Sequence, residues 1–155
     1  MSGAGAPTID IKRPGARVAI VASTWHTQVM DALVAAAEHR LNEAQCEVST
    51  FRVPGAFELP LGCQAVIDAG FQAVVALGVV IRGGTPHFEY VCEAATHGIS
   101  EVSLNSGVPV GFGLLTCDDE AQALDRSGLP GASESKGKEA AEAVLSMLAL
   151  LDDLA

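Results

Sequence analysis

Three continuous apolar runs constrain the fold of this chain more than any other feature of its sequence. They span Val18 to Ala22, Ala73 to Ile81 and Val108 to Leu115. Runs without polar alternation predict strands that are buried on both faces, which is typical of parallel sheets. Cys46 to Val53 carries more polar residues and is predicted to form a fourth strand at a sheet edge. Parallel strands need long crossover connections, so helices are expected between them.

Apolar residues recur at three- and four-residue steps between these runs, and this spacing predicts helices. The repeats are Met30, Leu33, Val34, Ala37 and Leu41, then Leu59, Cys63, Val66 and Ile67, and then Phe88, Val91, Cys92, Ala95, Ile99 and Val102. Thr116 with Asp119 resembles a capping box for a short helix to about Arg126. A last helix is predicted from about Ser135 to Leu151.

The alternation of strands and helices predicts an α/β fold of the flavodoxin-like kind, a three-layer sandwich. We expect a four-stranded parallel sheet in the order 2-1-3-4, with helices on both faces. In that order, ligands bind beyond the carboxyl ends of strands 1 and 3. The 155 residues, 49% of them hydrophobic, suit a single domain over 16–155. The Gly- and Pro-rich N-terminal segment, 1–15, is expected to be partly flexible.

Composition disfavours several classes of partner. The formal net charge of -10 would repel nucleic acid and anionic membrane surfaces. No apolar run approaches the roughly 20 residues that span a bilayer, and the chain does not begin like a secretion signal. A cytoplasmic protein without a membrane partner is therefore expected. The four cysteines are widely spaced and form no ligand cluster, so no metal site is expected and the thiols should be reduced.

The run RGGTPHFEY, which begins at Arg82, is predicted to hold an anion. Gly83 and Gly84 are expected to let the backbone bend and approach a ligand closely. Thr85 suits the N-cap of the next helix, and Pro86 suits its first position. Unpaired backbone N–H groups and the helix dipole would then favour a phosphate above the loop. An ordinary strand-to-helix turn would also use Gly and Pro, so the loop alone does not decide between the two interpretations.

Other residues near the predicted ligand edge also have two interpretations. His87 follows the glycine pair, where it has few structural roles, and its imidazole suits proton transfer. Trp25, the single tryptophan, could fill a gap between helices, but at the end of strand 1 stacking on a planar heterocycle is favoured. Glu58 could begin the second helix or bind hydroxyl and amide groups, and the sequence favours neither. Arg126 and Lys136 are either solvated or reserved for a phosphate.

Three motifs then give the chain a resemblance to a known family. They are VPGAFELP at Val53 to Pro60, ALGVVIRGGTPHFEYV at Ala76 to Val91, and VPVGFGLLT at Val108 to Thr116. With these motifs the chain resembles 6,7-dimethyl-8-ribityllumazine synthase from about Arg17 to Leu151. The resemblance implies condensation of 5-amino-6-(D-ribitylamino)uracil with 3,4-dihydroxy-2-butanone 4-phosphate, which is the penultimate step of riboflavin biosynthesis. It implies no cofactor and no metal, and it makes riboflavin synthase a candidate partner.

The resemblance also assigns residues to the ribitylaminouracil. Trp25 takes the position of an aromatic residue that stacks on the pyrimidine ring. The residues expected to bind the ring and the ribityl chain are Ala56, Phe57, Glu58, Val79, Val80 and Ile81. Phe112 corresponds to a residue that closes the ring pocket from the adjacent subunit.

For the butanone phosphate, the resemblance assigns Gly83, Gly84 and Thr85 to the loop that holds the phosphate. His87 matches the proposed proton-transfer residue, and Arg126 and Lys136 match the cations near the phosphate and the ribityl chain. Family members build each site between neighbouring subunits, which implies a homo-oligomer. Phe112, Arg126 and Lys136 are then expected in trans to Trp25, Glu58 and His87.

One departure from the family pattern concerns assembly. Icosahedral members commonly carry a short G-T-K-x-G-N-K turn, whereas this chain has a longer, Pro-containing segment from Ser127 to Gly137. This difference favours a free pentamer. Residues Thr8 to Arg13 are expected to pair with the sheet of a neighbour. Two alternatives stay open: an FMN-binding electron carrier, and a non-catalytic flavin- or lumazine-binding or cage-forming relative.

Overall fold

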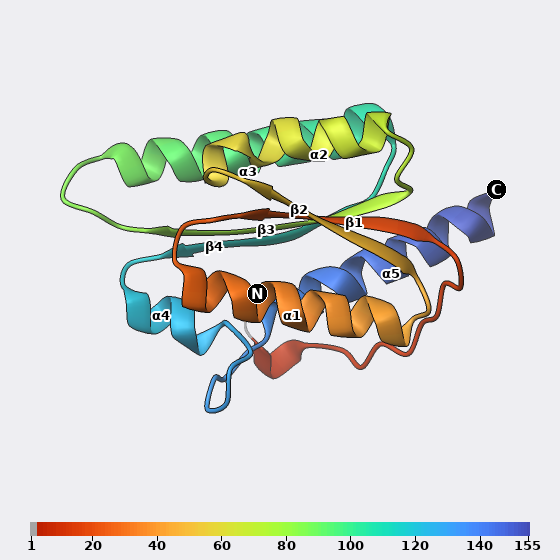
Figure 1. Cartoon of the computed structure of the whole chain (residues 1–155), viewed down its shortest axis with the longest axis horizontal. Helices are drawn as coiled ribbons and strands as arrows, with labels where there is room; N and C mark the ends of the chain where they lie inside the picture. The colour runs from red at the N-terminus through yellow and green to blue at the C-terminus, as the bar shows by residue number, and fades with distance from the viewer. Residues whose placement is uncertain (1–2) are drawn as a thin grey trace.

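A four-stranded parallel sheet forms the centre of the molecule. The computed structural model describes residues 3–155, and Met1 and Ser2, part of the segment expected to be flexible, lie outside them. The strands are β1 (Arg17–Ser23), β2 (Glu47–Val53), β3 (Ala73–Ile81) and β4 (Val110–Cys117). They pair in the order β2-β1-β3-β4, every pair parallel (Figure 1). The predicted strands, their order and their direction are confirmed.

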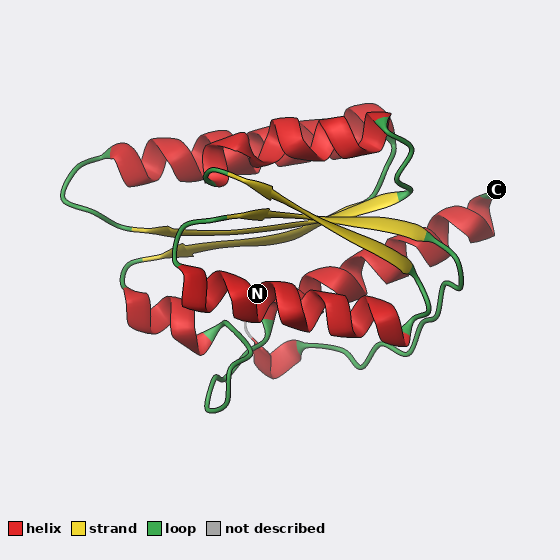
Figure 2. Cartoon of the chain, in the orientation of Figure 1, coloured by secondary structure: helices red, strands yellow, loops and turns green. Residues whose placement is uncertain are grey.

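Helices cover both faces of the sheet, as predicted (Figure 2). They are α1 (Thr27–Glu43), α2 (Leu59–Asp68), α3 (His87–Ser106), α4 (Glu120–Asp125) and α5 (Lys136–Leu154), with short 3-10 turns η1 (Gly3–Gly5) and η2 (Ala56–Glu58). Helices α2 and α3 lie on one face, and α1, α4 and α5 lie on the other. The sheet is therefore the middle layer of a three-layer sandwich.

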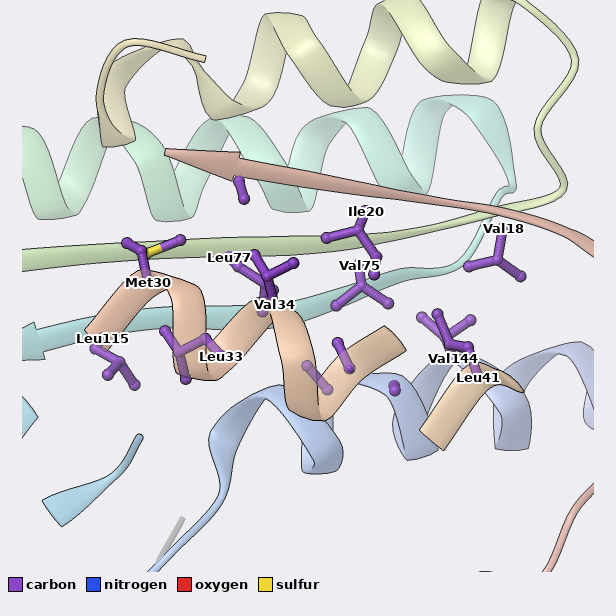
Figure 3. Packing of buried hydrophobic residues seen from close by; sticks show 14 of the residues in the cluster. Val18, Ile20, Met30, Leu33, Val34, Leu41, Val75, Leu77, Leu115 and Val144 are labelled. Atoms are coloured by element: carbon purple, nitrogen blue, oxygen red, sulfur yellow. The ribbon is translucent and has the colours of Figure 1, made fainter. Parts of the chain in front are cut away.

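Successive residues of the central strands point to opposite faces and build two separate apolar cores. Ile20 and Leu77 pack with Leu33 of α1 and Val144 of α5 (Figure 3). The residues that pack toward α2 and α3 instead are Ala19, Val21, Val74 and Ala76. Because each strand has an apolar side chain for both faces, its sequence is a continuous apolar run rather than an alternating one. Burial of each large aliphatic side chain contributes about 1.5–3 kcal/mol.

Helix α5 packs closely against its neighbours at two glycines. A Cβ atom at Gly137 would overlap the carbonyl oxygen of Leu33 in α1. A Cβ atom at Gly111 in β4 would overlap the carbonyl oxygen of Ala140 in α5. The first turn of α5, which begins with Lys136, is thereby held against the outer strand of the sheet.

The predicted capping box for α4 is wrong by three residues. Thr116 lies inside β4, because it pairs with Val80 of β3 and so extends β4 beyond its predicted end at Leu115. Asp119 is instead the N-cap, and its Oδ1 accepts a hydrogen bond from the Gln122 N–H at 2.9 Å. Gln122 Oε1 in turn accepts from the Asp118 N–H at 2.7 Å. The N-cap therefore lies three residues later than expected, and the Gln122 side chain reaches back to the residue before the N-cap rather than to the N-cap itself.

The N-terminal segment runs past α1 and α5 and is attached by hydrogen bonds to α1 and to Ala44, which follows that helix. Arg40 of α1 donates from Nη2 to the carbonyl oxygens of Ile9 at 3.1 Å and Ile11 at 3.4 Å. The same guanidinium, which is nearly buried, forms an ion pair with Glu142 of α5 at 3.7 Å. The Arg13 N–H donates to the Ala44 carbonyl oxygen at 2.8 Å. Within residues 3–155, no helix has the length and apolar character needed to cross a membrane.

Candidate active site

Loops that follow β1, β2 and β3 meet at one edge of the sheet and carry most of the predicted site. The carboxyl ends of parallel strands share an edge, so Trp25, Glu58 and the segment 82–86 all lie along it. Thr24 connects two of these loops, because its hydroxyl donates to the Pro54 carbonyl oxygen at 2.7 Å. These residues therefore lie where they were expected, beyond the carboxyl ends of the strands.

Trp25 projects from the loop between β1 and α1. Its side chain is 66% exposed, so it does not fill a gap between helices of this chain. The indole lies beside Gly55, where an added Cβ would be 3.6 Å from the indole Cδ1. His26 follows with φ of 60°, a left-handed conformation that reverses the chain before α1 begins at Thr27. An exposed, flat ring is therefore presented along the carboxyl edge of the sheet.

Glu58 begins the second helix, which is one of its two interpretations. It is the N-cap residue of α2, and its Oε2 accepts a hydrogen bond from the Gly55 N–H at 3.0 Å. The carboxylate thus holds the loop after β2. Phe57 next to it is 64% exposed, whereas Ala56 is buried. Behind them, Val79 is buried and Val80 and Ile81 are half-buried at the end of β3.

The loop between β3 and α3 is shaped differently from the sequence prediction. Neither Gly83 nor Gly84 has a positive φ, so the backbone bend does not require glycine. A Cβ at either position would meet nothing within 4 Å, so the loop leaves open space in front of its backbone. Helix α3 begins at His87, one residue later than predicted, and Thr85 Oγ1 accepts a long hydrogen bond of 3.4 Å from the His87 N–H. The His87 side chain is exposed.

Phe112, Arg126 and Lys136 form a second group, away from the first. They line one groove of about 830 Å3 beside the outer strand β4 and the first turns of α5. Trp25, Glu58, His87 and the loop 83–85 are absent from the lining of this groove. Phe112 is 49% exposed there. The structure therefore brings the predicted site residues together as two groups rather than one.

The model of a known protein family covers nearly the whole chain. The model for 6,7-dimethyl-8-ribityllumazine synthase matches residues 15–152. The chain belongs to the 6,7-dimethyl-8-ribityllumazine synthase family. The synthase of Leifsonia xyli is 59% identical over 148 residues, which is 94% of each chain. The synthase of Kineococcus radiotolerans is 54% identical, and the match covers 100% of this chain and 97% of that protein. The synthase of Streptomyces coelicolor is also 54% identical, and the match covers 97% of this chain and 95% of that protein.

One similar solved structure covers 91% of this chain and 70% of its own chain. A periplasmic ribose transporter from Conexibacter woesei is similar at 10% identity and a TM-score of 0.33, which is too distant to bear on the activity.

Glu134 is a residue of this lumazine synthase family member that sequence analysis missed. Its side chain is 11% exposed and forms ion pairs with Arg126 Nε at 3.7 Å and with Lys136 Nζ at 3.6 Å. Lys136 Nζ also lies 3.3 Å from Glu139, and Arg126 Nη1 donates to the Gln122 carbonyl oxygen at 2.9 Å. Both cations of the groove are therefore positioned by nearby acceptors. The signal in the sequence was a glutamate two residues before the lysine.

Glu134 lies in the segment from Ser127 to Gly137, between α4 and α5. Ser127 and Ser135 form an antiparallel bridge that folds the segment back on itself. Asp125 Oδ1 accepts hydrogen bonds from the Ser133 N–H at 3.0 Å and hydroxyl at 2.8 Å. These bonds hold the pKa of the Asp125 carboxyl below its ordinary value. The loop of this lumazine synthase relative is thus closed by its own hydrogen bonds.

The four cysteines of the described residues 3–155 carry thiols whose pKa is raised. Cys46, Cys63, Cys92 and Cys117 are free thiols. Burial raises the pKa of each thiol, and that of Cys63 to about 12. In the described part of the chain, no group of three or more His, Cys, Asp or Glu side chains could hold a metal ion.

Proposed function

We infer that this chain catalyses its family's reaction, in which 5-amino-6-(D-ribitylamino)uracil and 3,4-dihydroxy-2-butanone 4-phosphate give 6,7-dimethyl-8-ribityllumazine, phosphate and water. The enzyme is a transferase of riboflavin biosynthesis. Family membership over residues 15–152 is the observation that carries this conclusion. The identity of 54–59% to named synthases over almost the full chain supports the same reaction.

The first group of residues suits the pyrimidine. The ring would stack on Trp25, and the ribityl chain would run along Ala56, Phe57 and Glu58. Backbone groups of Val79, Val80 and Ile81 would contact the ring edge. The exposed indole and the accessible loop after β2 support these roles. A flat aromatic surface favours a planar heterocycle through apolar burial and offset stacking.

The second substrate would bind through its phosphate. Backbone N–H groups of Gly83, Gly84 and Thr85 would hold it at the start of α3, and a cation would balance its charge. The 5-amine attacks the ketone and loses water to form an imine, after which phosphate leaves, tautomerisation gives a new carbonyl, and the ribitylamine nitrogen closes the ring there with loss of a second water. His87 would move protons between these steps, and positioning of the two substrates would supply much of the acceleration.

The groove beside β4 would complete the site from a second copy of the chain. Phe112, Arg126 and Lys136 line a groove that none of Trp25, Glu58 and His87 reaches. Strand β4 is an unpaired edge beside that groove, which suits contact with another chain. We propose a cytoplasmic homopentamer in which each site is shared by neighbours, with riboflavin synthase as the partner that uses the product. Thr8 to Arg13 of the N-terminal segment would pair with a neighbour's sheet.

Product formation tests the activity. Purified protein is mixed with both substrates, and the absorbance of the lumazine is followed against a blank without protein, because the substrates react slowly unaided. We expect rapid formation that falls roughly tenfold to a hundredfold in His87→Ala without being abolished. An intact assembly that binds the pyrimidine but does not exceed the blank would point to the non-catalytic relative instead. A reversible flavin spectrum would point to the FMN carrier.

A further inference from the structure

We propose that Arg82 is a positioning residue that closes the phosphate loop 83–86 by holding α3 to the loop after β4. This inference rests on the proposed function, because it concerns how the phosphate site is formed. Arg82 occupies the first position after β3, directly before the two glycines. It is not one of the residues assigned to either substrate.

Arg82 contacts both sides of the loop. Its Nε donates to Asp118 Oδ1 at 2.9 Å, just beyond the end of β4. Its Nη1 donates to Glu89 Oε1 at 3.1 Å, in the first turn of α3. The guanidinium carbon also lies 4.5 Å from the centroid of the Phe88 ring. The side chain therefore spans the segment that contains the glycines, Thr85 and His87.

Other described contacts of this loop are few. A Cβ at either glycine would meet nothing within 4 Å, and the hydrogen bond that the His87 N–H donates to Thr85 Oγ1 is long at 3.4 Å. The Arg82 backbone N–H, by contrast, donates to the Cys117 carbonyl oxygen at 2.9 Å. Arg82 thus fixes the start of the loop through its backbone and the end through its side chain.

The same contacts matter electrostatically. Glu89 and Asp118 are two carboxylates beside a loop that would bind a phosphate, and without a cation they would repel it. Hydrogen bonds from Arg82 hold the pKa of the Asp118 carboxyl below its ordinary value. Hydrogen bonds to Asp118 and Glu89 in turn raise the pKa of the Arg82 guanidinium. Arg82 therefore keeps both carboxylates paired where the anion would approach.

The geometry favours arginine over lysine at this position. Two separate N–H groups reach two carboxylates, while the planar guanidinium rests on an aromatic ring. Lysine has a single ammonium group on a flexible stem and cannot make this arrangement as a whole. Arg82→Lys should keep the charge and lose part of the positioning.

Arg17 provides a matched control. It also lies 4.5 Å over a phenylalanine ring, that of Phe71, but at the beginning of β1 and hence at the opposite edge of the sheet. Arg17→Ala therefore removes the same charge and the same kind of stacking from a place far from the phosphate loop. It should leave both Michaelis constants within about twofold of the wild type.

Steady-state kinetics with each substrate varied in turn test the role of Arg82. We expect Arg82→Ala to raise KM for the butanone phosphate about tenfold and Arg82→Lys about threefold, with KM for the ribitylaminouracil changed less than about twofold. Circular dichroism confirms that each variant is folded. An unchanged KM for the butanone phosphate, or equal increases for both substrates, would overturn the inference.

Calorimetric titration with inorganic phosphate tests the same role without turnover. We expect weaker phosphate binding in Arg82→Ala and wild-type binding in Arg17→Ala. If the wild type does not accelerate lumazine formation, the proposed function fails, but weaker phosphate binding in Arg82→Ala would still support the inference. Equal phosphate affinity in Arg82→Ala and wild type would contradict the inference even where the enzyme is active.

Discussion

Glu58 holds the loop after β2 by accepting a hydrogen bond from the Gly55 N–H at 3.0 Å. The same carboxylate belongs to a residue expected to bind the ribityl chain. One of its oxygens is therefore used by the protein itself. The structural role of Glu58 should be separable from its ligand role, because the hydrogen bond from Gly55 needs an acceptor oxygen but no negative charge.

Substitutions at Glu58 should separate these roles. Glu58→Gln keeps an oxygen that can accept from Gly55, so its thermal stability should stay near that of the wild type while KM for the ribitylaminouracil rises severalfold. Glu58→Ala loses the hydrogen bond as well and should lose about 1 kcal/mol of stability. Thermal melts and steady-state kinetics on both variants check this. Equal stability of the two variants would show that the bond to Gly55 contributes little.

Trp25 should report binding of the pyrimidine. It is the single tryptophan of the sequence and is 66% exposed, so its fluorescence comes from the proposed site alone. Stacking of a heterocycle on the indole should quench this emission in a saturable way. The Trp25→Phe variant, which keeps an aromatic ring, should bind the pyrimidine with an affinity within about tenfold of the wild type. Saturable binding by calorimetry without any change in emission would place the pyrimidine elsewhere.

Gly137 should tolerate no side chain. A Cβ there would overlap the Leu33 carbonyl oxygen, so Gly137→Ala must push α5 away from α1. We expect a loss of about 1–3 kcal/mol in the free energy of unfolding, measured by denaturant titration. Gly84→Ala is the matched control, because a Cβ there meets open space and its φ is not positive. A Gly137→Ala variant as stable as the control would mean that α5 is less closely packed.

Cys63 should make the protein less stable at high pH. Burial raises the pKa of its thiol from the ordinary 9.0 to about 12. The unfolded chain loses the proton near pH 9 while the folded chain keeps it. The contribution of the buried Cys63 thiol to the free energy of unfolding is therefore complete below pH 9, and it is lost as the pH rises toward 12. Unfolding titrations of wild type and Cys63→Ala between pH 8 and about 11 should show a steeper decline in the wild type; parallel declines would contradict this.

Much of the fold followed from sequence because each strand is apolar on both faces. That pattern has few explanations other than a central parallel strand, as Ala73–Ile81 shows by matching its predicted bounds. The ligand edge followed in turn, because loops after parallel strands must meet there. Trp25, Glu58 and His87 were therefore predictable as neighbours of one edge.

Details that depend on tertiary contacts were not predictable in this way. Thr116 was a reasonable N-cap by pattern, but pairing with Val80 keeps it in β4 and moves the cap to Asp119. Glu134 reaches both cations only because the segment 127–135 folds back through the Ser127–Ser135 bridge. No spacing rule predicts such a loop.

The site residues lie in two groups, so a complete site requires that neighbouring copies of the chain assemble. His87 belongs to the group at the carboxyl edge, and Arg126 belongs to the groove beside β4. If neighbouring copies share each site, a subunit that lacks one residue can still provide the other. Subunits with His87→Ala and subunits with Arg126→Ala should then complement one another in a mixed assembly.

Lumazine formation by such mixed assemblies is the most direct test. The two variants are unfolded, mixed in equal amounts and refolded together, beside each variant refolded alone. A shared site predicts that about a quarter of the sites hold both native residues, so about a quarter of wild-type activity should return. Activity no higher than the average of the two variants alone, in assemblies shown to contain both, would mean that each site lies within one chain and would contradict the account.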